Sequence, residues 1–120
     1  MYAAGNQIDN LIVTVDYNKQ QIDGATDDVL PLGNLRAKFE AFDWDVVDIK
    51  NGNDLDAILN GMKIAKNKTG NGKPICVLLH TVMGNGVDFM MHTNAWHGKA
   101  PNDEQLEKAL KQNPVTLGDY

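Results

Sequence analysis

The sequence has few of the features that mark a secreted, membrane-bound or nucleic-acid-binding protein. Its single cysteine, Cys76, cannot form an internal disulfide, so we expect a reducing, cytoplasmic location. No apolar run approaches the roughly 20 residues that span a bilayer, and the first residues lack the pattern of a signal peptide. The chain has only 11 Lys and Arg residues but 16 Asp and Glu residues, which gives a net charge of −5. We therefore expect no general binding to nucleic acid or anionic membranes.

The remaining composition is ordinary for one globular domain of 120 residues, with 42% hydrophobic and 22% charged residues. Three short apolar runs rich in β-branched residues predict strands at 11–15, 45–49 and 74–79. The first and third are apolar on both faces, which predicts coverage by helices on both sides. The second alternates, which favours a position nearer an edge of the sheet.

Apolar residues at helical spacing separate these strands and follow the last one. Asp54 is placed to cap the second helix, and Asn102 with Gln105 to form a capping box for the third. The predicted helices lie at residues 35–42, 55–62 and 102–110. The alternation of strands and helices predicts an α/β fold, a three-layer α/β/α arrangement with a parallel sheet.

Two polar segments follow the first and third strands, where parallel sheets bind ligands. Asp16 and Asn18, with the backbone carbonyl of Gln20, offer oxygen ligands that suit Mg²⁺. Considered alone, however, Asp16 and Asn18 are more typical of Asx turns that end a strand. In the later segment, residues 84–86 resemble a piece of a phosphate-binding loop, although a plain turn is the favoured interpretation.

The three histidines, His80, His92 and His97, lack the spacing and the neighbouring Cys or Glu of a zinc site. His97 is the strongest candidate for chemistry, because Trp96 and Gly98 on either side indicate a packed and sharply turned site. A histidine there could donate to a phosphate or exchange a proton with a substrate. Cys76, in the middle of a strand, is expected to be a packing residue.

Three segments resemble transketolases in order and spacing. Residues 11–24, LIVTVDYNKQQIDG, resemble the second half of the thiamine diphosphate motif. Residues 80–87, HTVMGNGV, and 96–101, WHGKAP, resemble two further transketolase segments. The resemblance implies a partial thiamine diphosphate-binding domain over residues 1–101, followed by a C-terminal helix and tail over residues 102–120.

The resemblance also implies a role for each candidate residue. The Asn18 side chain and the Gln20 carbonyl would bind Mg²⁺, and Ile22 would pack against thiamine diphosphate. Asp16 would support the site, and His97 would reach the cofactor's phosphate and the donor sugar. The implied reaction is transfer of a two-carbon ketol unit between sugar phosphates.

The Gly-Asp-Gly half of the motif is absent, and residues 1–6 resemble the interior of the helix that follows it in longer relatives. We therefore expect a fragment or split subunit of a transketolase that is inactive alone, with either a complementing subunit or a homo-oligomer as its assembly. One alternative is a non-catalytic relic module that self-associates or docks on a partner. A deoxyxylulose-phosphate synthase-like domain ranks lower, because residues 96–98 favour transketolase.

Overall fold

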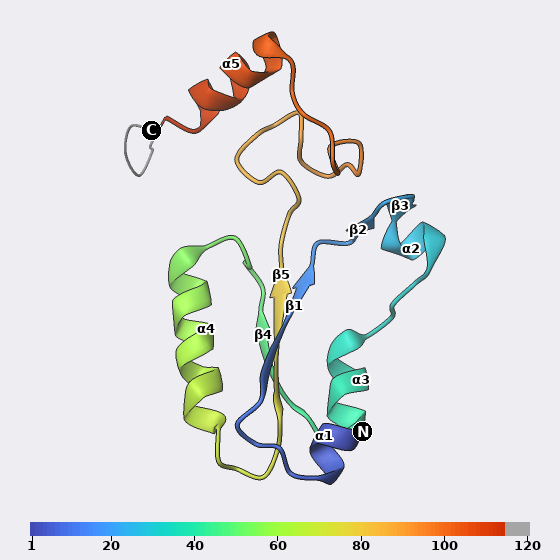
Figure 1. The fold of residues 1–120 in the computed structure, drawn as a ribbon, viewed down its shortest axis with the longest axis vertical. Helices are drawn as coiled ribbons and strands as arrows, with labels where there is room; N and C mark the ends of the chain where they lie inside the picture. The colour runs from blue at the N-terminus through green and yellow to red at the C-terminus, as the bar shows by residue number, and fades with distance from the viewer. Residues whose placement is uncertain (115–120) are drawn as a thin grey trace.

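The computed structural model describes residues 1–114, in which helices and strands alternate (Figure 1). The strands are β1 (Ile12–Tyr17), β2 (Gln20–Gln21), β3 (Gly24–Ala25), β4 (Asp45–Ile49) and β5 (Ile75–His80). The helices are α1 (Tyr2–Gly5), α2 (Thr26–Val29), α3 (Leu35–Ala41), α4 (Leu55–Lys68) and α5 (Asp103–Gln112).

The three long strands form a parallel sheet in the order β1-β5-β4. Ile75 of β5 is in register with Ile12 of β1 and with Asp45 of β4. The carboxyl ends of all three strands therefore meet at one edge of the sheet. This arrangement confirms the predicted α/β fold with a parallel sheet and the edge position of the 45–49 strand.

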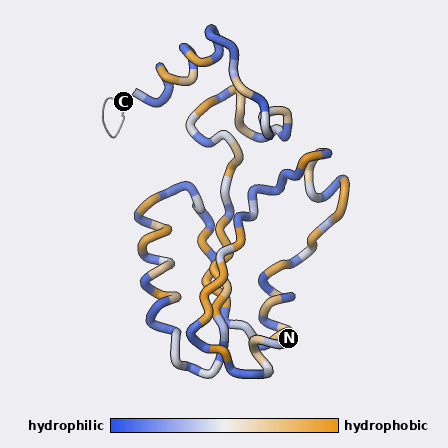
Figure 2. Tube along the Cα trace, viewed as in Figure 1, coloured by the Kyte–Doolittle hydropathy of each residue, from blue (hydrophilic) through white to orange (hydrophobic). Residues whose placement is uncertain are grey.

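The hydrophobic core lies between the sheet and α4, while α3 covers the opposite face (Figures 1 and 2). Gly61 lets α4 approach the sheet closely, because a Cβ at this position would lie 2.7 Å from Ile49 Cγ1. The buried residues of this core are Val47, Ile49, Ala65, Ile75 and Val77. Burial of such β-branched side chains is the main term that stabilises the sheet against α4.

The sequence predicted helices on both faces of the first and third strands, and the structure confirms this prediction only for the third strand. In β5, residues 75–78 are all buried, because β5 is the central strand and has helices on both faces. In β1, Thr14 and Asp16 are exposed, so the prediction that this strand is covered on both faces is wrong. β1 lies at the edge of the three-stranded sheet, and the face carrying these two side chains is left open there.

The caps predicted at Asp54 and Asn102 are confirmed. Asp54 Oδ1 accepts a hydrogen bond from Ala57 N at 2.7 Å. Asn34 caps α3 in the same way, its Oδ1 accepting from Ala37 N at 3.0 Å. Asn102 and Gln105 form the reciprocal capping box of α5. Sequence periodicity missed only short elements, namely α1, α2 and the β2–β3 hairpin. None of the helices within residues 1–114 has the length and apolar content of a membrane span.

Candidate functional site

Hydrogen bonds between segments far apart in the sequence fix the carboxyl edge of the sheet. Thr81 Oγ1 donates to Asp16 Oδ1, which joins the end of β1 to the residue after β5. Val82 N donates to Asn53 Oδ1 at 2.7 Å. Gly52 N donates to the His80 carbonyl oxygen at 2.7 Å, and a Cβ on Gly52 would lie 2.9 Å from that same oxygen. The loop that follows β5 therefore starts from a fixed position.

A tight turn after β1 presents the predicted metal ligands. Asn18 Oδ1 accepts a hydrogen bond from Gln20 N at 2.9 Å, so the Asx turn expected at Asn18 is present. Lys19 has a φ of +60°, and its carbonyl accepts from Thr26 N at 3.0 Å, which anchors the β2–β3 hairpin. An amide oxygen has two lone pairs, so the turn leaves Asn18 one acceptor position for a metal ion.

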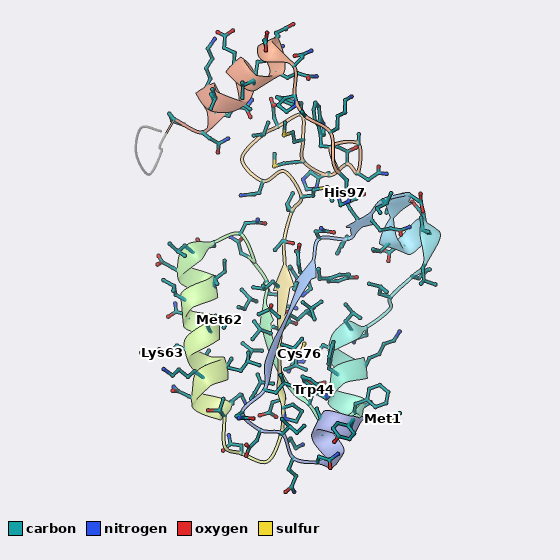
Figure 3. All side chains as sticks on the ribbon, in the orientation of Figure 1. Met1, Trp44, Met62, Lys63, Cys76 and His97 are labelled. Atoms are coloured by element: carbon teal, nitrogen blue, oxygen red, sulfur yellow. The ribbon has the colours of Figure 1, made fainter. Side chains whose placement is uncertain are left out.

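Asn94 joins the two predicted ligand segments. Its Nδ2 donates to the Ile22 carbonyl oxygen at 2.8 Å, and its own carbonyl accepts from His97 N at 3.0 Å. The segment after β1 and the turn that carries His97 are therefore in direct contact (Figure 3). Sequence reasoning gave Asn94 no role, and its only sequence signal is its place in a polar loop just before Trp96.

The turn at His97 is held by Trp96 rather than by the histidine itself. Trp96 Nε1 donates to the Phe89 carbonyl at 2.9 Å, and the two rings meet edge to face at 5.3 Å. Lys99 Nζ lies 5.2 Å from the Trp96 ring centroid, and Gly98 has a φ of +75°. The predicted packed and sharply turned site is thus present, and it leaves the His97 side chain exposed.

The candidate residues surround an open edge of the sheet rather than a closed cavity. Ile22 is 70% exposed, and Asp16 and His97 are exposed as well. The oxygens of Asn18 and Gln20 suit a hard cation such as Mg²⁺, which keeps water and phosphate oxygens in its shell when the protein supplies few ligands. Within residues 1–114, no group of three or more His, Cys, Asp or Glu is arranged to bind a metal ion.

Two other sequence features have structural roles. Residues 84–86 form the expected turn, with Val87 N donating to the Gly84 carbonyl at 3.1 Å. A Cβ on Gly84, whose φ is +70°, would lie 2.7 Å from the Met90 carbonyl oxygen. Cys76 is fully buried, and burial raises the pKa of its thiol to about 11, so its predicted packing role is confirmed.

A second polar cluster lies at the same edge of the sheet, and sequence reasoning missed it. His80, expected in a loop, instead ends β5, and its Nε2 lies 2.8 Å from Asp48 Oδ1. Lys50 Nζ lies 2.5 Å from Asp48 Oδ2. Burial raises the pKa of Asp48, but Lys50 and His80 together lower it more, so this pKa lies below its ordinary value. The only sequence signal was an acidic residue alternating with apolar ones in the second strand.

The structure is an α/β domain with a parallel sheet, and its joined loops bring candidate oxygen ligands and a histidine to the carboxyl edge, where such sheets bind ligands. Residues 1–115 match the family described as transketolase, thiamine diphosphate-binding domain, and the chain belongs to this family. The resemblance found in the three sequence segments is thereby confirmed, and thiamine diphosphate is the cofactor that defines the family.

Similar proteins include single subunits of transketolases. The chain is 36% identical to one subunit of the apulose-4-phosphate transketolase of Phocaeicola vulgatus, over 91% of this chain and 38% of that relative. It is 38% identical to the 6-deoxy-6-sulfo-D-fructose transketolase subunit SqwG of a Clostridium species, over 93% of this chain and 40% of that relative. The chain thus spans about two fifths of the length of these relatives.

Solved structures show the same fold. A Pichia stipitis transketolase in complex with sedoheptulose 7-phosphate matches with a TM-score of 0.81 and 29% identity. This match covers 93% of the present chain and 16% of that one. The chain therefore corresponds to part of a transketolase, within its thiamine diphosphate-binding domain.

Proposed function

We propose that this chain contributes the second half of a Mg²⁺–thiamine diphosphate site to a transketolase assembled from more than one chain. The observation that carries the proposal is the hydrogen bond from Asn94 to the Ile22 carbonyl. It brings the Asn18–Ile22 turn next to the His97 turn, and these are two of the segments that resemble transketolases. Two segments that bind one cofactor must lie next to each other, as these two turns do.

Each residue has one role in this proposal. Asn18 Oδ1 and the Gln20 carbonyl bind Mg²⁺, and the exposed Ile22 side chain packs against the cofactor. Asp16 supports the site by fixing Thr81, where the later loop starts. His97 donates from its exposed imidazole to a phosphate of the cofactor or of the sugar substrate.

When bound, thiamine diphosphate supplies the carbanion that moves a two-carbon ketol unit between sugar phosphates. The chain orients the diphosphate through Asn18 and Gln20 and holds the His97 imidazole beside it. Trp96 holds the turn in place, so the loop is already ordered when the His97 imidazole binds the phosphate. The proposed site of action is the cytoplasm, which agrees with a lone, buried cysteine.

A complementing chain is part of the proposal, and the surface of the molecule supports it. The accessible surface is 8311 Å², whereas a compact monomer of 13.2 kDa exposes about 6,400 Å². The difference, about 1,900 Å², is more than the roughly 800 Å² that each partner buries in a standard protein–protein interface. Several large apolar side chains are exposed on α4 and α5, namely Leu55, Leu59, Leu106 and Leu110.

The proposed cofactor site can be tested by NMR titration of the ¹⁵N-labelled 120-residue chain with thiamine diphosphate and Mg²⁺. We expect shifts at residues 16–22 and 94–98, with a dissociation constant of about 1 mM, because the site is open. Asn18→Ala should reduce binding about tenfold, whereas Asn67→Ala on the exposed surface of α4 should leave it unchanged. Omission of Mg²⁺ should weaken binding to a similar extent.

Two results would contradict this proposal. One is the absence of shifts at both loops up to about 20 mM ligand, well above the expected dissociation constant. The other is equal binding by Asn18→Ala and Asn67→Ala. Tight binding by the isolated chain in calorimetry would instead show that no complementing chain is needed to form the cofactor site.

A further inference from the structure

A cavity of about 300 Å³ opens on the face of the sheet that α3 covers, at the carboxyl edge. This is the lower end of the size range of small-molecule sites. Six side chains give this cavity, here named the α3 pocket, its chemistry: Tyr17, Arg36, Asp48, Lys50, Leu78 and His80.

The register of the sheet explains why side chains from three strands reach one pocket. Tyr17 of β1 is paired with His80 of β5, and Asp48 of β4 is paired with Leu78 of β5. Paired residues, and residues two apart on one strand, point to the same face of a sheet. That face is opposite the core under α4, and Asp16, one residue before Tyr17, points to the other side.

A buried carboxylate gathers two basic side chains in the α3 pocket. The Asp48 side chain is only 8% exposed, and it lies 2.5 Å from Lys50 Nζ and 2.8 Å from His80 Nε2. The contact with His80 lacks the alignment of a hydrogen bond, so neither Asp48 Oδ1 nor His80 Nε2 has a hydrogen-bond partner in the described part of the chain. Polar atoms this deeply buried are normally satisfied, and a phosphate oxygen could accept a hydrogen bond from His80 Nε2, although not satisfy Asp48 Oδ1, which is itself an acceptor.

Arg36 adds a third basic group at the first turn of α3. Its Nε donates to Glu40 at 2.8 Å, which leaves its two terminal nitrogens for another acceptor. Among the residues that line the pocket, Arg36, Lys50 and His80 accompany one carboxylate, Asp48, while Glu40, which pairs with Arg36, lies outside the lining. The lining therefore holds more basic than acidic side chains, in a chain whose net charge is −5, and this favours an anion.

We propose that the α3 pocket binds a small phosphate monoester. The terminal phosphate oxygens accept hydrogen bonds from Arg36, Lys50 and His80, and the organic part packs against Leu78 and the Tyr17 ring. Three donors match the three terminal oxygens of a phosphate monoester better than the two oxygens of a carboxylate. This site does not depend on the thiamine diphosphate proposal, because none of its six residues serves there.

Phenyl phosphate is a suitable probe, titrated into the ¹⁵N-labelled 120-residue chain at low salt. We expect shifts at residues 34–36, 48–50 and 78–80, with a dissociation constant of about 1 mM. Lys50→Gln should weaken binding about tenfold, and Lys50→Arg should restore most of it. Lys63→Gln is the matched control, because this exposed lysine lies on α4, on the other side of the sheet (Figure 3).

Asp48→Asn gives a test of opposite sign, because removal of the only carboxylate in the pocket should tighten phosphate binding several-fold. A misfolded variant would not bind more tightly. Asn18→Ala should not change phenyl phosphate binding, so failure of this proposal is distinguishable from failure of the cofactor proposal. The phosphate assignment is overturned if benzoate binds as tightly as phenyl phosphate. It is also overturned if Lys63→Gln weakens phenyl phosphate binding as much as Lys50→Gln does. Absence of shifts at the pocket residues would overturn it too.

Discussion

At the scale of single residues, polar side chains determine the geometry of the carboxyl edge. Asp16, Asn53 and Asn94 each bond to a segment far away in the sequence. Each such bond contributes about 0.5–1.5 kcal/mol, which is small beside the burial of the core. Their effect on position is larger than their effect on stability, because they place the loop that carries His97 against the turn that carries Asn18.

Asp48 should make the stability of the protein depend on pH in acid. Its pKa in the folded chain is lower than in the unfolded chain, so the unfolded state takes up a proton first as the pH falls. The stabilisation by Asp48 is complete above about pH 4 and is lost as the pH falls through the folded-state pKa. Asp48→Asn should cost about 1 kcal/mol at pH 7 and flatten this acid dependence.

Urea unfolding followed by Trp44 and Trp96 fluorescence, between pH 7 and about pH 2.5, measures this dependence. Asp56→Asn is the control, since Asp56 is an exposed carboxylate on α4. If the two variants lost stability in parallel with the unsubstituted chain below pH 4, the ion pairs of Asp48 would have no part in acid unfolding.

Apart from Asp16, sequence reasoning identified the polar residues that have local partners and missed those that have distant ones. Asn18, Asp54 and Asn102 each bond to a backbone N–H two or three residues ahead, so turn and cap rules find them. The partners of Asn94 and Asn53 lie 72 and 29 residues away. Those pairs depend on the order of the strands, which local patterns do not encode.

At the scale of elements, the contact between α4 and β4 depends on the small size of Gly61. A Cβ here would lie 2.7 Å from Ile49 Cγ1, in a core where Ile49 is buried and cannot move aside cheaply. Gly61→Ala should gain up to about 1 kcal/mol in helix propensity but lose about 1–3 kcal/mol to overpacking. We therefore expect a net destabilisation of about 1 kcal/mol, measured by urea unfolding.

Gly5→Ala is the matched control, because a Cβ on Gly5 meets nothing within 4 Å. It should leave the unfolding free energy unchanged or slightly higher. A Gly61→Ala variant as stable as Gly5→Ala would mean that α4 moves away from β4 at little cost.

The long elements were predictable, and the short ones were not. The strands at 45–49 and 75–80 and the helix caps follow from apolar periodicity and local hydrogen bonding. The β2–β3 hairpin has only two residues in each strand, too few for any periodicity, and it depends on the bond from Thr26 N to the Lys19 carbonyl. The partial exposure of β1 follows from its edge position, which its apolar sequence does not reveal.

At the scale of the whole molecule, the structure is elongated. Its principal extents are 52 × 36 × 20 Å, and its radius of gyration is 17.5 Å, against about 14 Å for a compact domain of 120 residues. The loop after β5 and α5 extend beyond the carboxyl edge (Figure 1). On α5, Leu106 and Leu110 are exposed, and an amphipathic helix of this kind is stabilised by packing its apolar face.

We therefore expect the chain to self-associate when it is purified without a partner. Light scattering at about 100 μM protein should give a mass of at least a dimer, since association depends on concentration. The double variant Leu106→Ser, Leu110→Ser should shift the mass toward the monomer, whereas Leu30→Ser, also exposed, should not. A monodisperse monomer at this concentration would argue against self-association. It would therefore count against a homo-oligomeric assembly and against a self-associating relic module.

The strand order has a consequence for how the chain folds. Of the strands in residues 1–114, β5 is the last to be synthesised, and it occupies the centre of the sheet, where Ile12 and Asp45 both pair with Ile75. During synthesis β1 and β4 lack β5, the strand with which both pair here, until residue 80 has left the ribosome. Such non-local pairing slows folding, and it leaves apolar strand edges open to wrong partners. Chaperone capture of the nascent chain should therefore be strongest just before β5 emerges.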